Sequence, residues 1–153
     1  MMRLCSDVLN ALKGKTLVTA ESCTGGGIGA ALTAVPGSSE VYKGGVICYT
    51  NWVKNSILNV DESLLDNYGA VSAPVAEAMA VGARSVLQAD VAVSVTGLAG
   101  PGTDAFGNAV GTVYIGYSSE AVTQVEKFCF SGDRESVRAQ AVRASLEMIL
   151  RIQ

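Results

Sequence analysis

The sequence predicts an α/β fold: a three-layer α/β/α sandwich with a mixed, mostly parallel sheet, in a single domain that spans residues 1–153. Short apolar runs rich in β-branched residues alternate with longer segments whose apolar residues recur at helical spacing. This alternation is typical of α/β domains. Glycine-rich turns follow two of the apolar runs. Near the C-terminus, a short link joins two apolar runs, which favours an antiparallel hairpin and makes the sheet mixed.

The first half of the chain is expected to contain two strands. Leu4, Val8 and Leu12 share one helical face, so an opening helix over residues 3–13 is predicted, ended by Gly14. The elements expected next are a strand over 16–21, a glycine turn with a helix that ends near Val35, a strand over 45–50 apolar enough to be central, a short helix or turn over 51–58, and a helix that Asp61 caps and Gly69 stops.

The second half begins with a long predicted helix. Ser72 is its candidate N-cap, Pro74 lies in its first turn, and it ends near Gln88. The elements expected next are a strand over 90–96, a glycine loop over 97–102, a polar surface loop over 103–108, hairpin strands over 111–117 and 122–128, and a final helix that opens at Gly132-Asp133.

The charge and hydropathy patterns exclude several classes of partner. The net charge is −3 and no basic block is present, so no binding of nucleic acid is expected. The most apolar region, residues 73–98, is interrupted by Glu77, Arg84 and Asp90, so no membrane-spanning helix is predicted. Charged residues make up only 16% of the chain, against about 25% in ordinary domains. We therefore expect a homo-oligomer, such as a dimer, in which another copy covers part of the surface.

The chain is expected to be cytoplasmic. Asp7 and Asn10 interrupt the N-terminal stretch in which the core of a signal peptide would lie. The four cysteines are widely spaced and form no Cys-x-x-Cys pair, so reduced thiols are expected rather than disulfides or a zinc site. They are Cys5, Cys23, Cys48 and Cys129.

The chain contains no histidine. Ser-His-Asp catalysis, Cys-His catalysis and histidine-ligated metal sites are therefore excluded. A serine nucleophile in this chain would need Lys, Asp, Glu or Tyr as its base. We expect neither a metal nor another cofactor.

Ser22 lies where a predicted strand turns through glycines into a helix. Free backbone N–H groups at such a turn favour an anion, or an oxygen on which negative charge develops. The N–H groups from Cys23 to Gly25 would then form an oxyanion hole, in which each donor is typically worth about 3 kcal/mol.

Three predicted strands end in polar or glycine-rich residues, at Glu21 to Thr24, at Tyr49 to Asn51 and at Thr96-Gly97. If these strands are parallel neighbours, their carboxyl ends meet in one crevice, where open α/β sheets bind ligands. Lys54 lies one turn beyond the second strand, so Ser22 and Lys54 are a candidate nucleophile and base. Burial would lower the pKa of the lysine, as this role requires. Tyr49 and Thr96 could hydrogen-bond the substrate or the lysine.

Each candidate also has another interpretation. Ser22 could cap the following helix, Lys54 could be a solvated surface lysine, and Tyr49 a strand aromatic at the rim of the sheet. Cys23 is a rival nucleophile, because a helix N-terminus lowers the pKa of a thiol. Residues 25–30 loosely fit the fingerprint of a dinucleotide-binding oxidoreductase, G-x-G-x-x-A, although no acidic residue ends the next strand.

Arg134 and Arg138 lie one turn apart near the start of the final predicted helix. The helix dipole disfavours cations at this end. A bound phosphate would compensate for that cost, and so would a surface ion pair with Asp133 or Glu135.

Multi-residue motifs extend along nearly the whole chain. They are residues 19–26 (TAESCTGG), 35–39 (VPGSS), 44–49 (GGVICY) with Asn51 and Lys54, 69–72 (GAVS), 95–102 (VTGLAGPG), 111–114 (GTVY) and 132–138 (GDRESVR). In this order and spacing they resemble the CinA C-terminal domain family, also called nicotinamide-nucleotide amidohydrolases.

The resemblance implies hydrolysis of the carboxamide of nicotinamide mononucleotide to nicotinate mononucleotide and ammonia, by a serine nucleophile and a lysine base, without a metal. Carried over by motif, Ser22 attacks the amide carbon, Lys54 takes the serine proton, and Tyr49 and Thr96 assist at the reacting end. The residues implied to bind the substrate are Glu21, Cys23, Thr24, Gly25, Gly26, Gly97 and Gly100, with Arg134 or Arg138 on the phosphate.

The chain departs from the family pattern after residue 102. Family members often carry a further glycine and then a Lys-Pro pair before the Gly-Thr-Val strand, whereas residues 103–110 (TDAFGNAV) have neither in those places. A catalytically altered nucleotide-binding module of the same fold is therefore the alternative function. Many members also carry an N-terminal nucleotide-processing domain, and this chain resembles the stand-alone form.

Overall fold

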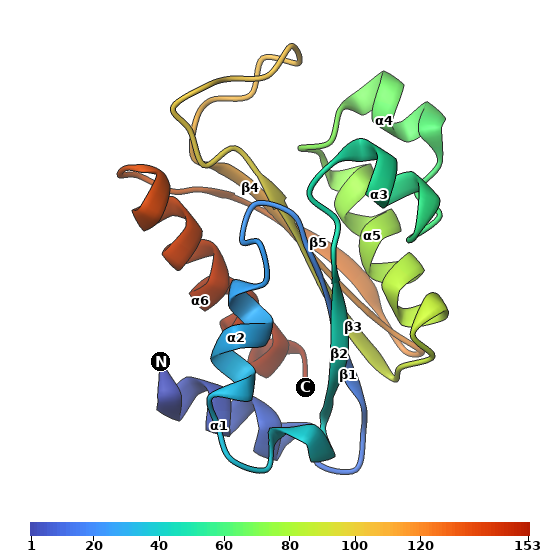
Figure 1. Cartoon of the computed structure of the whole chain (residues 1–153), viewed down its shortest axis with the longest axis vertical. Coiled ribbons are helices and arrows are strands. Elements are labelled where there is room, and N and C mark those ends of the chain that lie inside the picture. Colours follow the sequence, from blue (N-terminus) through green and yellow to red (C-terminus); the bar gives the residue numbers. More distant parts are fainter.

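The computed structural model describes residues 1–153 as a five-stranded sheet with helices on both faces (Figure 1). The strands are β1 (Leu17–Glu21), β2 (Tyr42–Ile47), β3 (Val91–Gly97), β4 (Thr112–Ser119) and β5 (Thr123–Cys129). Their order in the sheet is β2-β1-β3-β4-β5. β1 pairs in parallel with β2 and β3, whereas β4 pairs antiparallel with β3 and β5. The predicted mixed α/β sandwich is therefore confirmed, with every strand except β4 running in one direction.

The helices form the two outer layers. They are α1 (Met2–Ala11), α2 (Gly27–Thr33), the short 3₁₀ helix η1 (Ser38–Glu40), α3 (Asn51–Ser56), α4 (Glu62–Tyr68), α5 (Ala73–Val86) and α6 (Arg134–Ile152). α1, α2 and α6 cover one face of the sheet, and α3, α4 and α5 cover the other (Figure 1).

Each face of the sheet carries its own apolar core, because successive side chains of a strand point to opposite faces. In β3, Val93 and Val95 belong to the core beneath α1, α2 and α6, whereas Ala92 belongs to the core beneath α4 and α5. In β1, Leu17 and Val18 divide in the same way. This alternation matters at the end of β1, where adjacent side chains are directed to different layers.

The predicted helix starts are confirmed, with one change of detail. The Asp61 side chain accepts a hydrogen bond from the Ser63 N–H at 2.8 Å, and the Asp133 side chain accepts one from the Ser136 N–H at 2.9 Å. Ser72 occupies the N-cap position of α5, but its hydroxyl donates to the carbonyl of Gly69 instead of capping the helix. Ser72 therefore fixes the connection that enters α5.

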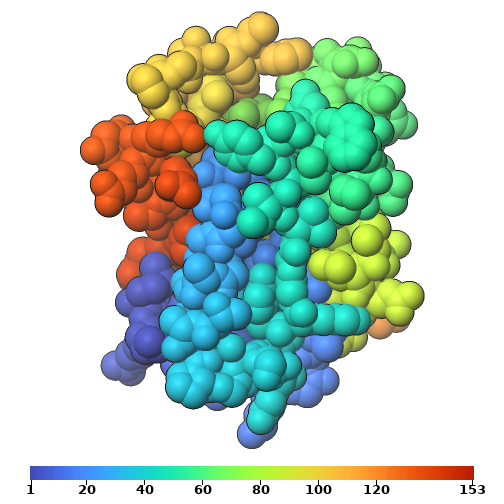
Figure 2. All heavy atoms as spheres, viewed as in Figure 1, coloured from blue at the N-terminus to red at the C-terminus, as the bar shows by residue number.

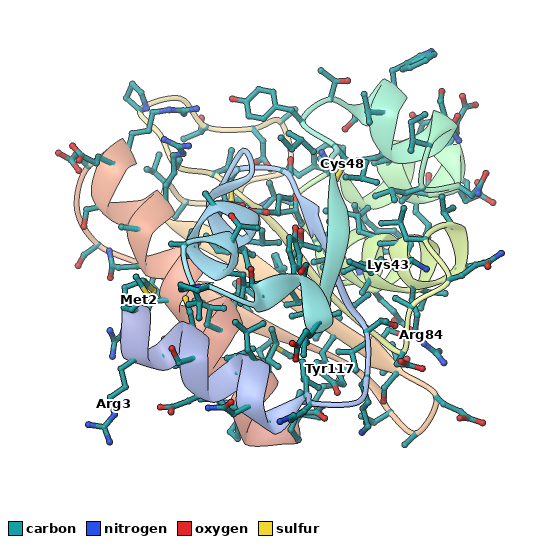
Figure 3. All side chains as sticks on the ribbon, turned by 60° about the horizontal axis from the view of Figure 1, so that its bottom comes forward. Met2, Arg3, Lys43, Cys48, Arg84 and Tyr117 are labelled. Carbon is teal, nitrogen blue, oxygen red and sulfur yellow. The ribbon has the colours of Figure 1, made fainter.

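The prediction that the second strand is central was wrong, because β2 is an edge strand paired only with β1. Its residues alternate between half-buried and exposed, and Lys43 and Ile47 lie on the exposed side. A charged lysine is typical of an edge strand, and Lys43 donates to the carbonyl of Gln88 (Figure 3). Trp52 of the following helix is also exposed. The expected homo-oligomer stays a prediction.

The four cysteines are free thiols, as predicted. No helix of the chain combines the length and the apolar character needed to cross a membrane.

The carboxyl ends of β1, β2 and β3 lie at one edge of the sheet because these strands are parallel. The turn after β1 passes through Gly26, which has a φ of 102° and is the N-cap of α2. A left-handed conformation of this kind favours glycine over residues with a side chain. The glycines of this turn thus let the chain leave β1 and enter α2 within a few residues.

Candidate active site

A cavity of about 490 Å³ opens at the carboxyl ends of β1, β2 and β3. The predicted convergence of the three strand ends is thereby observed. Eight of the candidate residues line this cavity: Ser22, Cys23, Tyr49, Lys54, Thr96, Gly97, Gly100 and Arg134. Glu21, Thr24, Gly25, Gly26 and Arg138 are not among its lining residues.

Ser22 and Lys54 are in direct contact in this cavity. The Nζ atom of Lys54 lies 2.8 Å from the Oγ atom of Ser22. Nζ also donates to the carbonyls of Cys48 at 2.7 Å and of Tyr49 at 3.3 Å, and Cys48 lies just beyond the end of β2 (Figure 3). Only 1% of the lysine and 7% of the serine is exposed. The interpretation of Lys54 as a solvated surface lysine is therefore wrong.

Burial also changes the chemistry of Lys54. Removal from water disfavours the ammonium form, and this lowers the pKa of Lys54 below its ordinary value of 10.5. No carboxylate lies within ion-pair distance of its nitrogen to reverse this effect. A lysine with a lowered pKa is neutral more often near neutral pH, and only the neutral amine can accept a proton.

Ser22 does not cap the following helix. α2 begins at Gly27 with Gly26 as its N-cap, and the side chain that accepts hydrogen bonds from its first free N–H groups is that of Glu21, not that of Ser22. The Ser22 N–H donates to the Val95 carbonyl at 3.0 Å, which ties the end of β1 to β3. The hydroxyl of Ser22 is thus held at the cavity with Lys54 as its hydrogen-bond partner.

The backbone around Ser22 supports only part of the predicted oxyanion hole. The Gly25 N–H donates to the Ser22 carbonyl at 3.1 Å and closes the turn. The N–H groups of Cys23 and Thr24 donate to no other residue. Those two amides, rather than that of Gly25, are the available donors.

The expectation that the helix N-terminus lowers the pKa of Cys23 is wrong. Burial instead raises the pKa of its thiol to about 11, and this effect outweighs the nearby positive charges of Lys54 and Arg138. The thiolate is the nucleophilic form of cysteine. Near neutral pH, Cys23 is therefore a poor nucleophile beside Ser22.

Tyr49 and Arg134 meet across the cavity mouth. The phenol oxygen of Tyr49 accepts a hydrogen bond from the guanidinium of Arg134 at 3.0 Å, and the same guanidinium donates to the Gly100 carbonyl at 2.8 Å. Both side chains are exposed. Arg134 forms no ion pair, so the predicted pairing with Asp133 or Glu135 is not found.

Thr96 lines the cavity at the end of β3. Its hydroxyl donates to the Ala70 carbonyl at 2.8 Å and is buried. It thereby ties the end of β3 to the connection between α4 and α5. Its proton is directed to that carbonyl and not to Lys54.

Glu21 lies on the opposite face of the sheet from Ser22. Its carboxylate accepts hydrogen bonds from the Thr24 hydroxyl at 2.7 Å, from the Ile28 N–H at 2.8 Å and from the Gly29 N–H at 3.0 Å. Glu21 is only 2% exposed. The side chains of Glu21 and Thr24 therefore hold the start of α2, and the expected role of the two residues in binding the substrate stays a prediction.

Arg138 supports the glycine turn from outside the cavity. Its guanidinium donates to the carbonyls of Cys23 at 3.0 Å and of Thr24 at 3.2 Å, and it lies close to Gly25. Like Arg134, it forms no ion pair. Because Arg134 lines the cavity and Arg138 does not, Arg134 is the better candidate for contact with a substrate phosphate.

Sequence reasoning missed part of the cavity wall. Residues 103–108 were expected to form a plain surface loop, yet Asp104 and Phe106 line the cavity, as do Ala70 and Val71 from the α4–α5 connection. The sequence signal for this part of the wall is the pair Asp104 and Phe106, an acidic and an aromatic residue that follow the glycine-rich end of β3 within a few positions. No three His, Cys, Asp or Glu side chains lie close enough together to hold a metal ion.

Comparison with known proteins gives a consistent match. The family model described as the CinA C-terminal domain matches residues 2–152. A "CinA-like protein" of Desulfotalea psychrophila is 48% identical over 91% of this chain, which spans about a third of the length of that relative. The nicotinamide-nucleotide amidohydrolase PncC of Escherichia coli is 42% identical over 97% of this chain and 92% of its own length.

Solved structures agree with the sequence matches. A CinA superfamily protein of Escherichia coli has a TM-score of 0.97 and 36% sequence identity, covering 99% of this chain and 90% of its own. A competence damage-inducible protein of Klebsiella pneumoniae has a TM-score of 0.95 and 36% identity, covering 98% and 94% of the two chains.

Proposed function

The chain belongs to the CinA C-terminal domain family, and we propose that it is an amidohydrolase that converts nicotinamide mononucleotide to nicotinate mononucleotide and ammonia. The name of the PncC relative supports this substrate class. The observation that carries the proposal is the buried 2.8 Å contact between Ser22 and Lys54 in the cavity at the sheet edge.

In the proposed reaction, neutral Lys54 accepts the proton of the Ser22 hydroxyl while the serine oxygen attacks the carboxamide carbon. A neutral amine has two N–H groups, and the carbonyls of Cys48 and Tyr49 accept both. The third contact of Nζ is the Ser22 oxygen at 2.8 Å, which accepts a hydrogen bond from the ammonium form and donates its proton to the lone pair of the neutral amine. The two carbonyls therefore orient Lys54 as a base.

Attack by Ser22 places negative charge on the former carboxamide oxygen. The free N–H groups of Cys23 and Thr24 would stabilise this charge, and removal of such a donor typically costs about 3 kcal/mol. The tetrahedral intermediate collapses when Lys54 returns the proton to the leaving nitrogen, so ammonia departs and an ester forms on Ser22. Lys54 then takes a proton from water, the hydroxide attacks the ester carbon, and Lys54 gives the proton to the departing Ser22 oxygen, so nicotinate mononucleotide is released and the enzyme is restored.

Arg134 would bind the phosphate of the substrate. Its guanidinium lines the cavity, is exposed and lacks a carboxylate partner. Planar guanidinium groups bind phosphate through paired hydrogen bonds. Its present contacts with the Tyr49 phenol and the Gly100 carbonyl hold it at the cavity mouth, where the charged end of a nucleotide would lie.

Purified chain incubated with nicotinamide mononucleotide tests the proposal. We expect ammonia and nicotinate mononucleotide in equal amounts, with no added metal, and no release by the Ser22→Ala variant. Binding of the nucleotide without turnover would instead favour the alternative, a catalytically altered binding module. Equal release by both proteins would contradict the assignment of the nucleophile.

A further inference from the structure

The loop after β3 forms one wall of the cavity, and a hydrogen bond attaches it to the α4–α5 connection, which also lines the cavity. Asp104 accepts hydrogen bonds from the N–H groups of Phe106 and Asn108, both at 3.1 Å, and from the Asn108 side chain at 2.6 Å. Asn108 also donates to the Val71 carbonyl at 3.0 Å. These bonds join the loop to the α4–α5 connection, and the two segments lie beside each other at the top of Figures 1 and 2.

Phe106 presents an aromatic ring to the cavity. Its side chain is 49% exposed, and it lines the cavity together with Ser22 and Lys54. The ring packs on Gly69, where an added methyl group would lie 2.5 Å from a ring carbon. Gly69 also has a φ of 77°, which favours glycine. The backbone beneath the ring thus fixes its position from one side.

Asp104 brings a negative charge to the same wall. It is the only acidic residue among those that line the cavity, and it forms no ion pair. Although partial burial acts in the opposite direction, hydrogen bonds from Asn108 and Phe106 lower the pKa of Asp104 below its ordinary value of 3.8. Its carboxylate is therefore ionised near neutral pH and has no cation as its partner.

We propose that Asp104 and Phe106 form the subsite for the cationic pyridinium ring of the substrate and make this chain selective for the oxidised nucleotide. The reduced, dihydropyridine form has a neutral ring and the same carboxamide and phosphate. A carboxylate and an aromatic face both attract a cation, and neither attraction acts on a neutral ring. The reacting carboxamide is attached to the ring, so the ring subsite must share the cavity of Ser22.

This inference rests on the proposed function, because it takes a pyridine nucleotide as the ligand. It assigns a role to residues 103–110, the segment in which the chain departs from the family pattern. It also gives two charged side chains of the cavity different roles: Arg134 binds the phosphate, and Asp104 attracts the pyridinium ring.

Calorimetric binding of oxidised and reduced nicotinamide mononucleotide to the Ser22→Ala protein tests the proposal without interference from turnover. In that background, Asp104→Asn and Phe106→Leu are each expected to weaken binding of the oxidised form about tenfold and to leave binding of the reduced form nearly unchanged. Glu120→Gln, at an exposed carboxyl group in the turn between β4 and β5, is the control and should change neither.

The ratio of the two affinities separates a ring subsite from a structural role. Equal weakening of both forms would overturn the proposal, because it would show that the substitutions only disturb the loop. Unchanged binding of both forms, or no binding of either to the Ser22→Ala protein, would also overturn it. The proposed function is judged separately, by ammonia release from the wild-type chain.

Discussion

The nitrogen of Lys54 lies 2.8 Å from the oxygen of Ser22, although 32 positions separate the two residues in the chain. Parallel pairing of β1 with β2 brings them together, because Ser22 follows β1 and Lys54 lies in the short helix after β2. Glu21 is paired with Ile47 at the ends of these strands. The catalytic proposal depends on this contact more than on any other.

The rate of amide hydrolysis is expected to rise with pH through the pKa of Lys54. Burial lowers that pKa below 10.5, and only the neutral amine accepts the serine proton. At lower pH, the ammonium form predominates and the rate falls. The measurement is kcat/KM for ammonia release across a pH series, with circular dichroism as the control for folding. A rate that falls steadily as the pH rises, while the fold persists, would contradict the role of Lys54.

Substitution of Cys23 by alanine is expected to leave the hydrolysis rate close to that of wild type. The pKa of its thiol is raised to about 11 by burial, so little thiolate exists near neutral pH. For the same reason, iodoacetamide should modify the exposed Cys129 well before Cys23, as peptide mass spectrometry would show. Loss of activity in a folded Cys23→Ala protein would reverse the assignment of the nucleophile.

Arg134→Ala is expected to weaken binding of the substrate, whereas Arg138→Ala is expected to lower the stability of the fold. Arg134→Ala should raise KM for the nucleotide but not for nicotinamide riboside, which lacks the phosphate, and should leave the melting temperature unchanged. Arg138→Ala removes two hydrogen bonds to the carbonyls of the glycine turn. It should lower the free energy of unfolding by about 1–3 kcal/mol. The opposite assignment of the two effects would show that Arg138 binds the phosphate.

Glu21→Gln is expected to destabilise the fold by about 1–3 kcal/mol, because one of the three donors that the buried carboxylate satisfies at the start of α2 loses its acceptor. Urea unfolding measures the change, and Glu40→Gln, at an exposed glutamate, is the matched control. If Glu21→Gln instead raises KM while stability is unchanged, the glutamate contacts the substrate.

Local signals in the sequence predict three features of the fold: the sheet, its three converging strand ends and the helix caps. Apolar alternation marks strands, and Asp61 and Asp133 mark helix starts. The position of β2 in the sheet could not be predicted, because the run from Gly45 to Tyr49 is equally compatible with a central strand. Only the pairing reveals that its outer side is exposed.

The candidate site also has features that the sequence predicts and features that only the structure reveals. Strand order predicts that Ser22 and Lys54 share one crevice. The motif leaves open whether Arg134 or Arg138 binds the phosphate, and only the structure shows that Arg134 lines the cavity. The family resemblance implies that Glu21 binds the substrate that Ser22 attacks, yet strand alternation directs these two adjacent side chains to opposite faces. The contribution of Phe106 depends on its packing against Gly69, a contact between distant segments that no local pattern encodes.

The most direct test of the central claim is ammonia release from nicotinamide mononucleotide by the Lys54→Met variant, with Lys43→Met as the matched control. Lys43 lies on β2, is exposed, and reaches Gln88 rather than the cavity. Loss of the general base should slow Lys54→Met by about 100-fold or more, while Lys43→Met should match wild type. Turnover by Lys54→Met at the wild-type rate would contradict the Ser22–Lys54 mechanism.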